Sequence, residues 1–427
     1  MIPSPPLARR LLPLSPLHPI THHPRLAARI AAMLREVGSI LPPMSQMPSF
    51  TSPDVTPLSS DLETAARAFL PDATEIASVP GHPSLARVSA PTGLWRVRRW
   101  PETTPNSDVT FSHEVIDRAR EAGIATAPAL LTPPGAPEDA SAIRLDGRLY
   151  DAQRWLPGAP PAGAEVAWPS PEDRIDLPVT VAPVVFTTLV TALARLHDAT
   201  AALATRRGIP TAPLRLLPGT VRQAQGRHLD ALRPRARQEP TIQRWLATGE
   251  RLIAAAEPLI RAATEPREPP SAVLHLGLWP SHVLIDNGHL SGLLGWERVA
   301  AGSPLLDLAQ AVIRLQGWRD ETVEMALGAY GDLRDLKPEE RRLLPAVAAL
   351  DAVATTGRLL EQTFVIAEAA RPPAPLRAGI DMMLRSMADI ERSLLDPSQK
   401  SRRRTWVRRP HTPGAGPRGG TPRERRR

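Results

Sequence analysis

Residues 275–297, HLGLWPSHVLIDNGHLSGLLGWE, have the outline of a phosphate-handling active site. A histidine and a turn lead into a strand-like run, and a second turn leads into another run that ends in Trp-Glu. Such a site needs carboxylates that hold a metal ion beside the phosphates. Where they are needed the chain has Gly277 and Gly295, and glycine supplies no ligand. The segment therefore keeps the frame of a catalytic centre without its charged positions.

The elements that must position this segment fall into two groups. Strand-like runs and one helix, which ends at Gly123, occupy residues 74–155. From about residue 183 the periodicity is helical, apart from the strand-like runs within 273–297. The proline-rich stretch LPGAPPAGAE at 156–165 predicts a linker between the two groups. The sequence therefore predicts a bilobal α+β fold, with a small β-sheet lobe followed by a larger, mainly helical lobe.

The expected elements have definite boundaries. Order is expected to begin at Ser60, where Ser60 and Glu63 form a capping-box pattern. The expected strands of the first lobe are Thr74–Val79, Leu85–Ala90, Leu94–Trp100, Ala142–Leu145 and Leu149–Trp155. The expected helices are 111–124, 183–205, 217–233, 239–263, 304–317, 320–332, 338–365 and 375–395. A strand hairpin is expected at Val283–Ile285 and Leu290–Leu294.

The composition shows where the positive charge lies and which segments are expected to lie outside the folded lobes. The chain has 427 residues, 50 prolines and no cysteine, which excludes disulfides and thiolate metal sites. Its formal charge is +8, but residues 398–427 hold eleven basic side chains and one acid. We expect disordered segments at 1–50 and 398–427, an N-terminal lobe at 51–157 and a helical C-terminal lobe at 158–397. We predict no membrane span, and we expect a cytoplasmic protein.

The second lobe resembles the aminoglycoside phosphotransferase and choline kinase-like family, which is related to protein kinases. The matches to the family signature are His275, Leu278, Pro280, Val283, Leu284, Gly292, Leu293, Leu294, Trp296, Glu297, Gly302, Pro304, Asp307, Leu308 and Ala309. With the elements before it, the resemblance covers roughly residues 55–395. It implies a protein kinase-like fold and transfer of a phosphoryl group from ATP to a hydroxyl group of a small molecule.

The chain departs from the family at the positions that carry the chemistry. In the family, an Asp at the position of Gly277 positions the acceptor hydroxyl. An Asn and an Asp, at the positions of His282 and Gly295, bind Mg²⁺. Imidazole is a poor substitute for an oxygen ligand, because Mg²⁺ prefers hard oxygen donors. The resemblance therefore implies a degenerate, pseudokinase-like site with no metal, in which His275, Glu297 and Asp307 remain as frame residues.

Nucleotide binding is expected to be weak at most. Arg98, in the strand-like run WRVRR, matches the family position at which a cation contacts nucleotide phosphates, and Glu114 matches its partner on the next helix. Alternatively, Arg98 is an ordinary strand arginine in a chain with only two lysines. PGHPSLARVS at 80–89 has one glycine between two prolines, which leaves little backbone to cover phosphates. We expect weak, Mg²⁺-independent ATP binding or no cofactor. Trp279 either stacks on a planar ligand or fills the core.

Three functions remain open. The favoured one is a degenerate family member that binds an unknown small molecule or protein partner. The second is an active ATP-dependent kinase of a hydroxyl-bearing metabolite or antibiotic, with a metal site rearranged around Glu297 or Asp307. The third is a nucleic-acid-associated protein that acts through the basic tail at 398–427, for which nonspecific anionic partners are expected.

Overall fold

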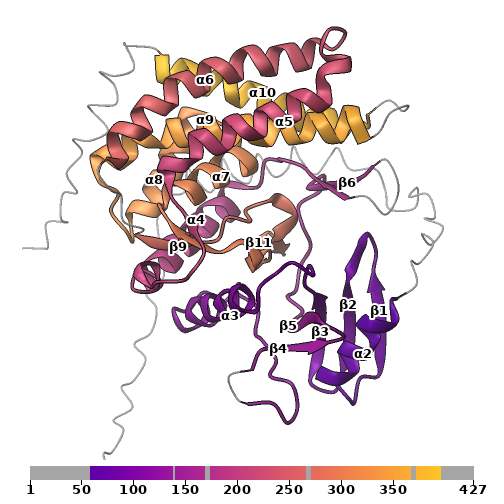
Figure 1. Ribbon diagram of the computed structural model, residues 1–427. Helices are drawn as coiled ribbons and strands as arrows, with labels where there is room; N and C mark the ends of the chain where they lie inside the picture. Colours follow the sequence, from indigo (N-terminus) through magenta and orange to yellow (C-terminus); the bar gives the residue numbers. More distant parts are fainter. Residues whose placement is uncertain (1–57, 138–139, 169–173, 266–270, 367–371, 396–427) are drawn as a thin grey trace, which may run out of the picture. The chain divides into compact units, whose positions relative to one another are not determined.

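The structure of the protein is a computed structural model (Figure 1). It describes residues 58–137, 140–168, 174–265, 271–366 and 372–395. The segments 1–50 and 398–427, which we expected to be disordered, lie outside the described residues.

The N-terminal part contains a five-stranded antiparallel sheet, as the sequence predicted. Its strand order is β1-β2-β3-β5-β4. The strands are β1 Glu75–Val79, β2 His82–Ala90, β3 Gly93–Arg99, β4 Ala142–Leu145 and β5 Arg148–Arg154. The alternating apolar residues of these strands, among them Val88, Val97 and Tyr150, form a core against helix α2, Ser60–Phe69.

The predicted capping box at the start of α2 does not form. Ser60 is the first helical residue, and Ser59 occupies the N-cap position without a side-chain capping bond. The shift of one residue moves Glu63 beyond the position from which it would reach back to the N-cap. Glu63 instead pairs with Arg67, one turn further on, at 3.2 Å.

Helix α3, Asn106–Glu121, starts five residues earlier than predicted and links the two parts of the chain. It buries Val115, Ile116 and Ala119 in the same core as the C-terminal helices. The Ser112 hydroxyl donates to the backbone carbonyl of Trp296 at 2.8 Å. This contact brings α3 against the segment that the sequence marked as the candidate site.

The C-terminal part is mainly helical, as predicted. Its helices are α4 Pro183–Ala199, α5 Leu217–Ala236, α6 Pro240–Thr264, α7 Leu305–Leu315, α8 Asp320–Gly331, α9 Pro338–Glu361 and α10 Ala374–Leu395. Helix α9 packs against α5, α6, α7 and α10 (Figure 1). Among the described helices, the stretch Pro338–Val365 is long and apolar enough to cross a membrane, but 78% of its apolar window is buried inside the protein. We interpret it as the core helix of this lobe.

Short strands complete the fold around the candidate site. The predicted hairpin is present as β10 Val283–Asp286 and β11 His289–Leu293. Five short strands were not predicted, because two or three residues carry no periodicity: β6 Glu165–Ala167, β7 Arg174–Asp176, β8 Thr211–Ala212, β9 Ala272–Leu274 and β12 Ala300–Gly302. The turn expected between His275 and the hairpin is present at Pro280–His282. The expected linker at 156–165 is tied to the hairpin, since Ala159 and Ile285 exchange backbone hydrogen bonds of 3.1 and 2.8 Å.

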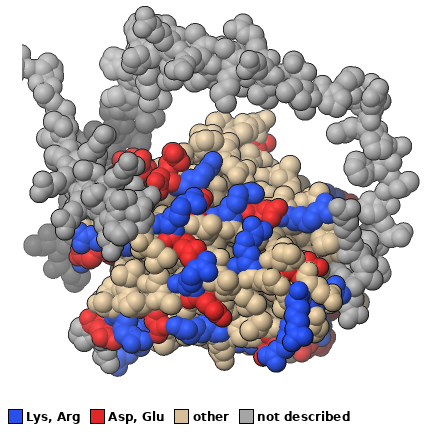
Figure 2. Space-filling view, turned by 90° about the horizontal axis from the view of Figure 1, so that it is seen from above, with Lys and Arg blue, Asp and Glu red and all other residues tan. Residues whose placement is uncertain are grey.

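The described surface carries charges of both signs. Figure 2 shows arginines interspersed with acidic side chains on one face. Several of the arginines of α5, α6 and α10 are paired, for example Arg261 with Glu257 at 2.8 Å and Arg233 with Asp230 at 2.6 Å. The excess positive charge of the chain therefore lies mainly in the tail at 398–427, where the sequence placed it.

Candidate active site

The loop that follows β9 is held at its start by a buried carboxylate. Asp307, in the first turn of α7, accepts the backbone N–H groups of His275 and Leu276 at 2.7 and 2.8 Å. Leu276 has a left-handed backbone, with φ of 54°, so the chain turns sharply where Asp307 holds it. Burial alone would raise the pKa of Asp307, but the hydrogen bonds that it accepts from His197 and from the backbone outweigh burial and lower that pKa.

Two further helices support Asp307. His197 Nε2, on α4, lies 2.9 Å from Asp307 Oδ2, and His197 Nδ1 lies 2.9 Å from the Tyr330 hydroxyl on α8. Because the carboxylate can only accept, we assign the proton of His197 to Nε2, and the Tyr330 hydroxyl then donates to Nδ1. All three side chains are buried. Their hydrogen bonds fix the position of the loop relative to three helices.

His275 is a buried neutral residue of the frame. Its Nδ1 accepts the N–H of Gly277 at 3.2 Å, and its ring meets Trp296 edge-on at 4.8 Å between centroids. Within the described residues its Nε2 has no hydrogen-bond partner. Burial lowers the pKa of His275 to about 4, so the ring is uncharged at neutral pH.

The structure brings Gly277, His282 and Gly295 together. His282 Nδ1 lies 2.6 Å from the carbonyl oxygen of Gly277, and the N–H of Leu294 donates to the carbonyl oxygen of His282 at 2.8 Å. A Cβ atom at position 277 would lie 2.4 Å from the carbonyl oxygen of Gly295. A Cβ atom at position 295 would lie 2.3 Å from His282 Nδ1. The imidazole and the two backbones therefore occupy the space that longer side chains at 277 and 295 would need.

Arg98 lies in a closed cluster of charges on the sheet. Its NH2 lies 2.7 Å from Asp151 Oδ2, on the neighbouring strand β5, and its NH1 lies 3.0 Å from Glu297. Asp151 also accepts from the Trp100 indole at 3.1 Å, and His113 Nε2 lies 2.8 Å from it. The charge of Arg98 is therefore already balanced by two carboxylates.

The pKa shifts in this cluster reflect the same pairing. Burial opposes ionisation of both partners, but the Arg98 charge and the hydrogen bond from His113 lower the pKa of Asp151. Burial would also lower the pKa of Arg98, but Asp151 and Glu297 outweigh it and raise that pKa. The cluster is thus stable with both carboxylates ionised and Arg98 charged.

Glu114 is not the partner of Arg98, contrary to the prediction. It forms a two-point ion pair with Arg206, with distances of 2.7 and 3.0 Å. Helix α3 instead turns His113, one residue earlier, toward Asp151. The sequence analysis missed Asp151 and His113. An acid inside the apolar strand run LYDAQRW was a possible signal for Asp151, but its pairing with Arg98 follows from the β3–β5 register.

The sequence model of the phosphotransferase enzyme family matches residues 83–347, which is more than half of the chain. The chain belongs to this family. No curated protein sequence matches it.

Solved structures of phosphotransferases share the fold of this family member. An aminoglycoside phosphotransferase from Alicyclobacillus acidocaldarius subsp. acidocaldarius DSM 446 is 15% identical, with a TM-score of 0.59, over 83% of this chain and 99% of that one. An AMP-bound spectinomycin phosphotransferase is 10% identical, with a TM-score of 0.52, over 79% and 98%. A microcompartment-associated aminopropanol kinase is 14% identical, with a TM-score of 0.51, over 78% and 98%. At these identities the likeness confirms the predicted bilobal α+β fold and nothing finer.

Phosphoryl transfer in this family implies Mg²⁺, and the residues of this chain do not fit that ion. Mg²⁺ needs oxygen ligands in an octahedral array. The two carboxylates that the family frame places here are engaged: Asp307 with two backbone N–H groups and His197, and Glu297 with Arg98. Among the described residues, no group of three histidine or acidic side chains could hold a metal ion.

In this family the turn between β1 and β2 would lie over the nucleotide phosphates, and in this chain the side chain of Arg174 lies against that turn at Gly81. A Cβ atom at Gly81, between β1 and β2, would lie 2.2 Å from Nε of Arg174 on β7. Burial lowers the pKa of His82, the next residue, and the charge of Arg174 lowers it further. The side chain of Arg174 therefore lies against the turn at the side where Gly81 has no Cβ atom.

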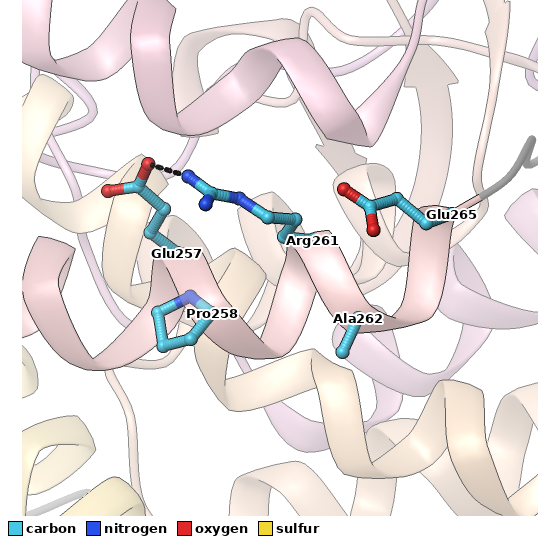
Figure 3. Close-up of a pocket in the computed structure, with 5 residues that line it drawn as sticks. All are labelled: Glu257, Pro258, Arg261, Ala262 and Glu265. Atoms are coloured by element: carbon cyan, nitrogen blue, oxygen red, sulfur yellow. Dashed lines mark hydrogen bonds and ion pairs between the residues drawn. The ribbon is translucent and has the colours of Figure 1, made fainter.

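A surface pocket of about 420 Å³ lies elsewhere, on α6 (Figure 3). Its lining residues are Glu257, Pro258, Arg261, Ala262 and Glu265. Arg261 and Glu257 pair with each other, as the dashed line in Figure 3 marks. The pocket contains none of the predicted site residues. Its charged lining residues, Glu257, Arg261 and Glu265, all come from α6 or its C-terminal end.

Proposed function

We propose that this protein is a catalytically degenerate, pseudokinase-like member of the phosphotransferase family. It acts by binding a small molecule or a protein partner, in the cytoplasm, without transferring phosphate. The observation that carries this proposal is the contact of His282 with Gly277 and Gly295. Where the family places an acceptor-positioning carboxylate and two metal ligands, this chain has two backbones and an imidazole in contact.

The surroundings of this contact support the proposal. Phosphoryl transfer depends on a positioned metal ion and on cations that neutralise the charge of the transferred group. Asp307 and Glu297 have other partners, which argues against a rearranged metal site. The loss of one electrostatic stabiliser commonly reduces a rate by roughly a hundredfold or more. The combined loss of the hydroxyl-positioning and metal-holding groups leaves the chemical step without its main sources of stabilisation.

Nucleotide binding is proposed to be weak and independent of Mg²⁺. Arg98 is the sheet cation at the family's phosphate-contacting position, and nucleotide phosphates would compete for it with Asp151 and Glu297. Arg174 lies against the Gly81 turn, where it further limits access. Without oxygen ligands for the metal, adding Mg²⁺ to ATP should not strengthen binding.

The test is a phosphate-transfer assay with the purified full-length chain. Radiolabelled ATP is offered with Mg²⁺ or Mn²⁺ and a panel of aminoglycosides, choline-like alcohols, sugars and amino alcohols. We expect no transfer above background. Turnover that Glu297→Ala or Asp307→Ala abolishes would overturn the proposal in favour of an active kinase with a relocated metal site. A thermal-shift titration with ATP, with and without each metal ion, measures nucleotide binding separately.

A further inference from the structure

Arg358, on α9, is a buried cation without a counterion. Its Nε is inaccessible to solvent and has no hydrogen-bond partner within the described residues. The residue as a whole is only partly buried. A guanidinium that is removed from water without a partner costs free energy, and such groups are usually paired. Arg358 therefore needs a partner that these described residues do not supply.

The neighbours of Arg358 belong to the candidate active-site loop. Its guanidinium carbon lies 4.3 Å from the centroid of the Trp279 ring, and that of Arg314 lies 4.4 Å from the same centroid. Trp279 is buried and donates its backbone N–H to the carbonyl oxygen of Gly277 at 2.9 Å. The aromatic ring stabilises both cations through its face, but it does not neutralise them.

Arg314 and Arg358 differ in their pairing. Arg314 forms a two-point ion pair with Asp351, with distances of 2.6 and 3.2 Å. Burial and the charges of Arg314 and Arg298 together lower the pKa of Arg358 to about 10, although Asp176 and Asp351 oppose the change. Asp351 therefore pairs with Arg314, whereas no carboxylate of the described residues forms an ion pair with Arg358.

A second unpartnered group lies just beyond the end of α9, at Gln362. Gln362 follows Arg358 by four residues, a spacing that places two side chains next to each other on a helix. Its side-chain oxygen is buried and has no hydrogen-bond partner within the described residues. A ligand with an acidic group and a hydroxyl would complement both: the acid would accept from Arg358, and the hydroxyl would donate to Gln362.

We infer that Arg358, beside Trp279 and Arg314, binds the carboxylate or phosphate group of a small molecule. A planar guanidinium donates two parallel hydrogen bonds to either group, and the neighbouring positive charges favour an anion. The inference names the ligand class for the binding role proposed above and rests on that role. It is tested by binding alone, so it can fail or succeed independently of phosphate transfer.

The experiment measures the melting temperature of the full-length protein with increasing inorganic phosphate or citrate, with chloride at matched ionic strength as the reference. Phosphate and citrate distinguish the two sources of the oxyanion. The variants are Arg358→Gln, Arg358→Lys and a control, Arg342→Gln, which removes an exposed arginine from the same helix. All keep the basic tail, so anion binding there is the same in each.

We expect the wild type and Arg342→Gln to be stabilised by at least one of the two anions. In Arg358→Gln the apparent affinity for that anion should fall by roughly tenfold or more, because a charge-assisted hydrogen bond is lost. Arg358→Lys should retain part of it. Without anion, Arg358→Gln should be as stable as the wild type or more so, since an unpaired buried charge is removed. Equal anion-induced shifts in the wild type and Arg358→Gln would overturn the inference.

Discussion

At position 295, the backbone and the neighbouring ring each require glycine. Gly295 has a φ of 84°, a conformation that is unfavourable for residues with a Cβ atom, and the His282 ring lies where that atom would be. The glycine is therefore part of the packing of this loop. A carboxylate placed there would have to displace His282 from its contact with Gly277.

Gly295→Ala should therefore destabilise the protein for two separable reasons. The left-handed backbone costs about 1–2 kcal/mol, and overpacking against His282 adds about 1–3 kcal/mol. Urea unfolding measures the sum. Gly288→Ala is the matched control, because Gly288 has a φ of 79° and nothing within 4 Å of its added Cβ. It should show the backbone cost alone.

The part of the Gly295→Ala cost that comes from overpacking should disappear when the imidazole ring of His282 is removed. In a double-mutant cycle, His282→Ala combined with Gly295→Ala should recover more than about 0.5 kcal/mol relative to the sum of the single changes. An additive cycle, together with equal costs for Gly295→Ala and Gly288→Ala, would show that His282 does not restrict position 295.

At the scale of elements, one carboxylate joins three helices to the loop. Asp307 of α7 holds the loop backbone, His197 of α4 holds Asp307, and Tyr330 of α8 holds His197. The interactions are buried throughout, so each lost partner leaves a polar group unsatisfied. The buried network thus holds the loop from three helices.

The residues of this network should contribute unequally to the free energy of unfolding, with Asp307 contributing more than Tyr330. Asp307→Asn turns an amide toward groups that donate, and it should cost about 3–5 kcal/mol, as expected when one partner of a buried charged pair is removed. Tyr330→Phe removes a single outer hydroxyl and should cost about 1 kcal/mol. Urea unfolding of both variants tests the order. Equal costs would mean that Asp307 contributes no more to the loop than the hydroxyl does.

At the scale of the whole molecule, the sequence predicted what depends on periodicity and on motif spacing. The five strands of the sheet and the main helices follow from periodicity, and His275 and Asp307 meet because their spacing belongs to a known frame. The partner of Arg98 could not be predicted in this way. Asp151 lies opposite Arg98 because of the register of β3 and β5. Glu114 and His113 are consecutive residues of α3 and point in different directions, so His113 contacts Asp151 and Glu114 contacts Arg206.

The space around the two glycines was likewise beyond sequence reasoning. The sequence shows that ligands are absent from Gly277 and Gly295, but the proximity of the His282 ring to both follows only from the fold. Motif matching assigns a role to each position separately. It does not report that one degenerate position fills the space of another.

The basic tail gives a prediction from sequence alone. Residues 398–427 hold eleven basic side chains and one acid, whereas charges of both signs are mixed on the described surface. Deleting the tail should remove most salt-sensitive binding to DNA or anionic vesicles, because such binding follows clustered positive charge. The melting temperature should stay nearly unchanged. A large drop would mean that the tail stabilises the folded part.

The stability of the whole molecule should depend on pH through His275. Its pKa is lowered from 6.5 to about 4 by burial, so the unfolded chain takes up the proton more readily than the folded one. The contribution of the neutral His275 to the free energy of unfolding is complete above about pH 6.5. It is lost as the pH falls toward 4, and the total loss is about 3 kcal/mol. The pKa of His82 is also lowered, so His82 makes a separate contribution to the pH dependence of stability. His275→Gln should remove only the share of His275, so the stability of the variant relative to the wild type should rise as the pH falls. The exposed His289→Gln should leave the profile unchanged, and identical pH profiles for the wild type and His275→Gln would rule out His275 as the titrating group.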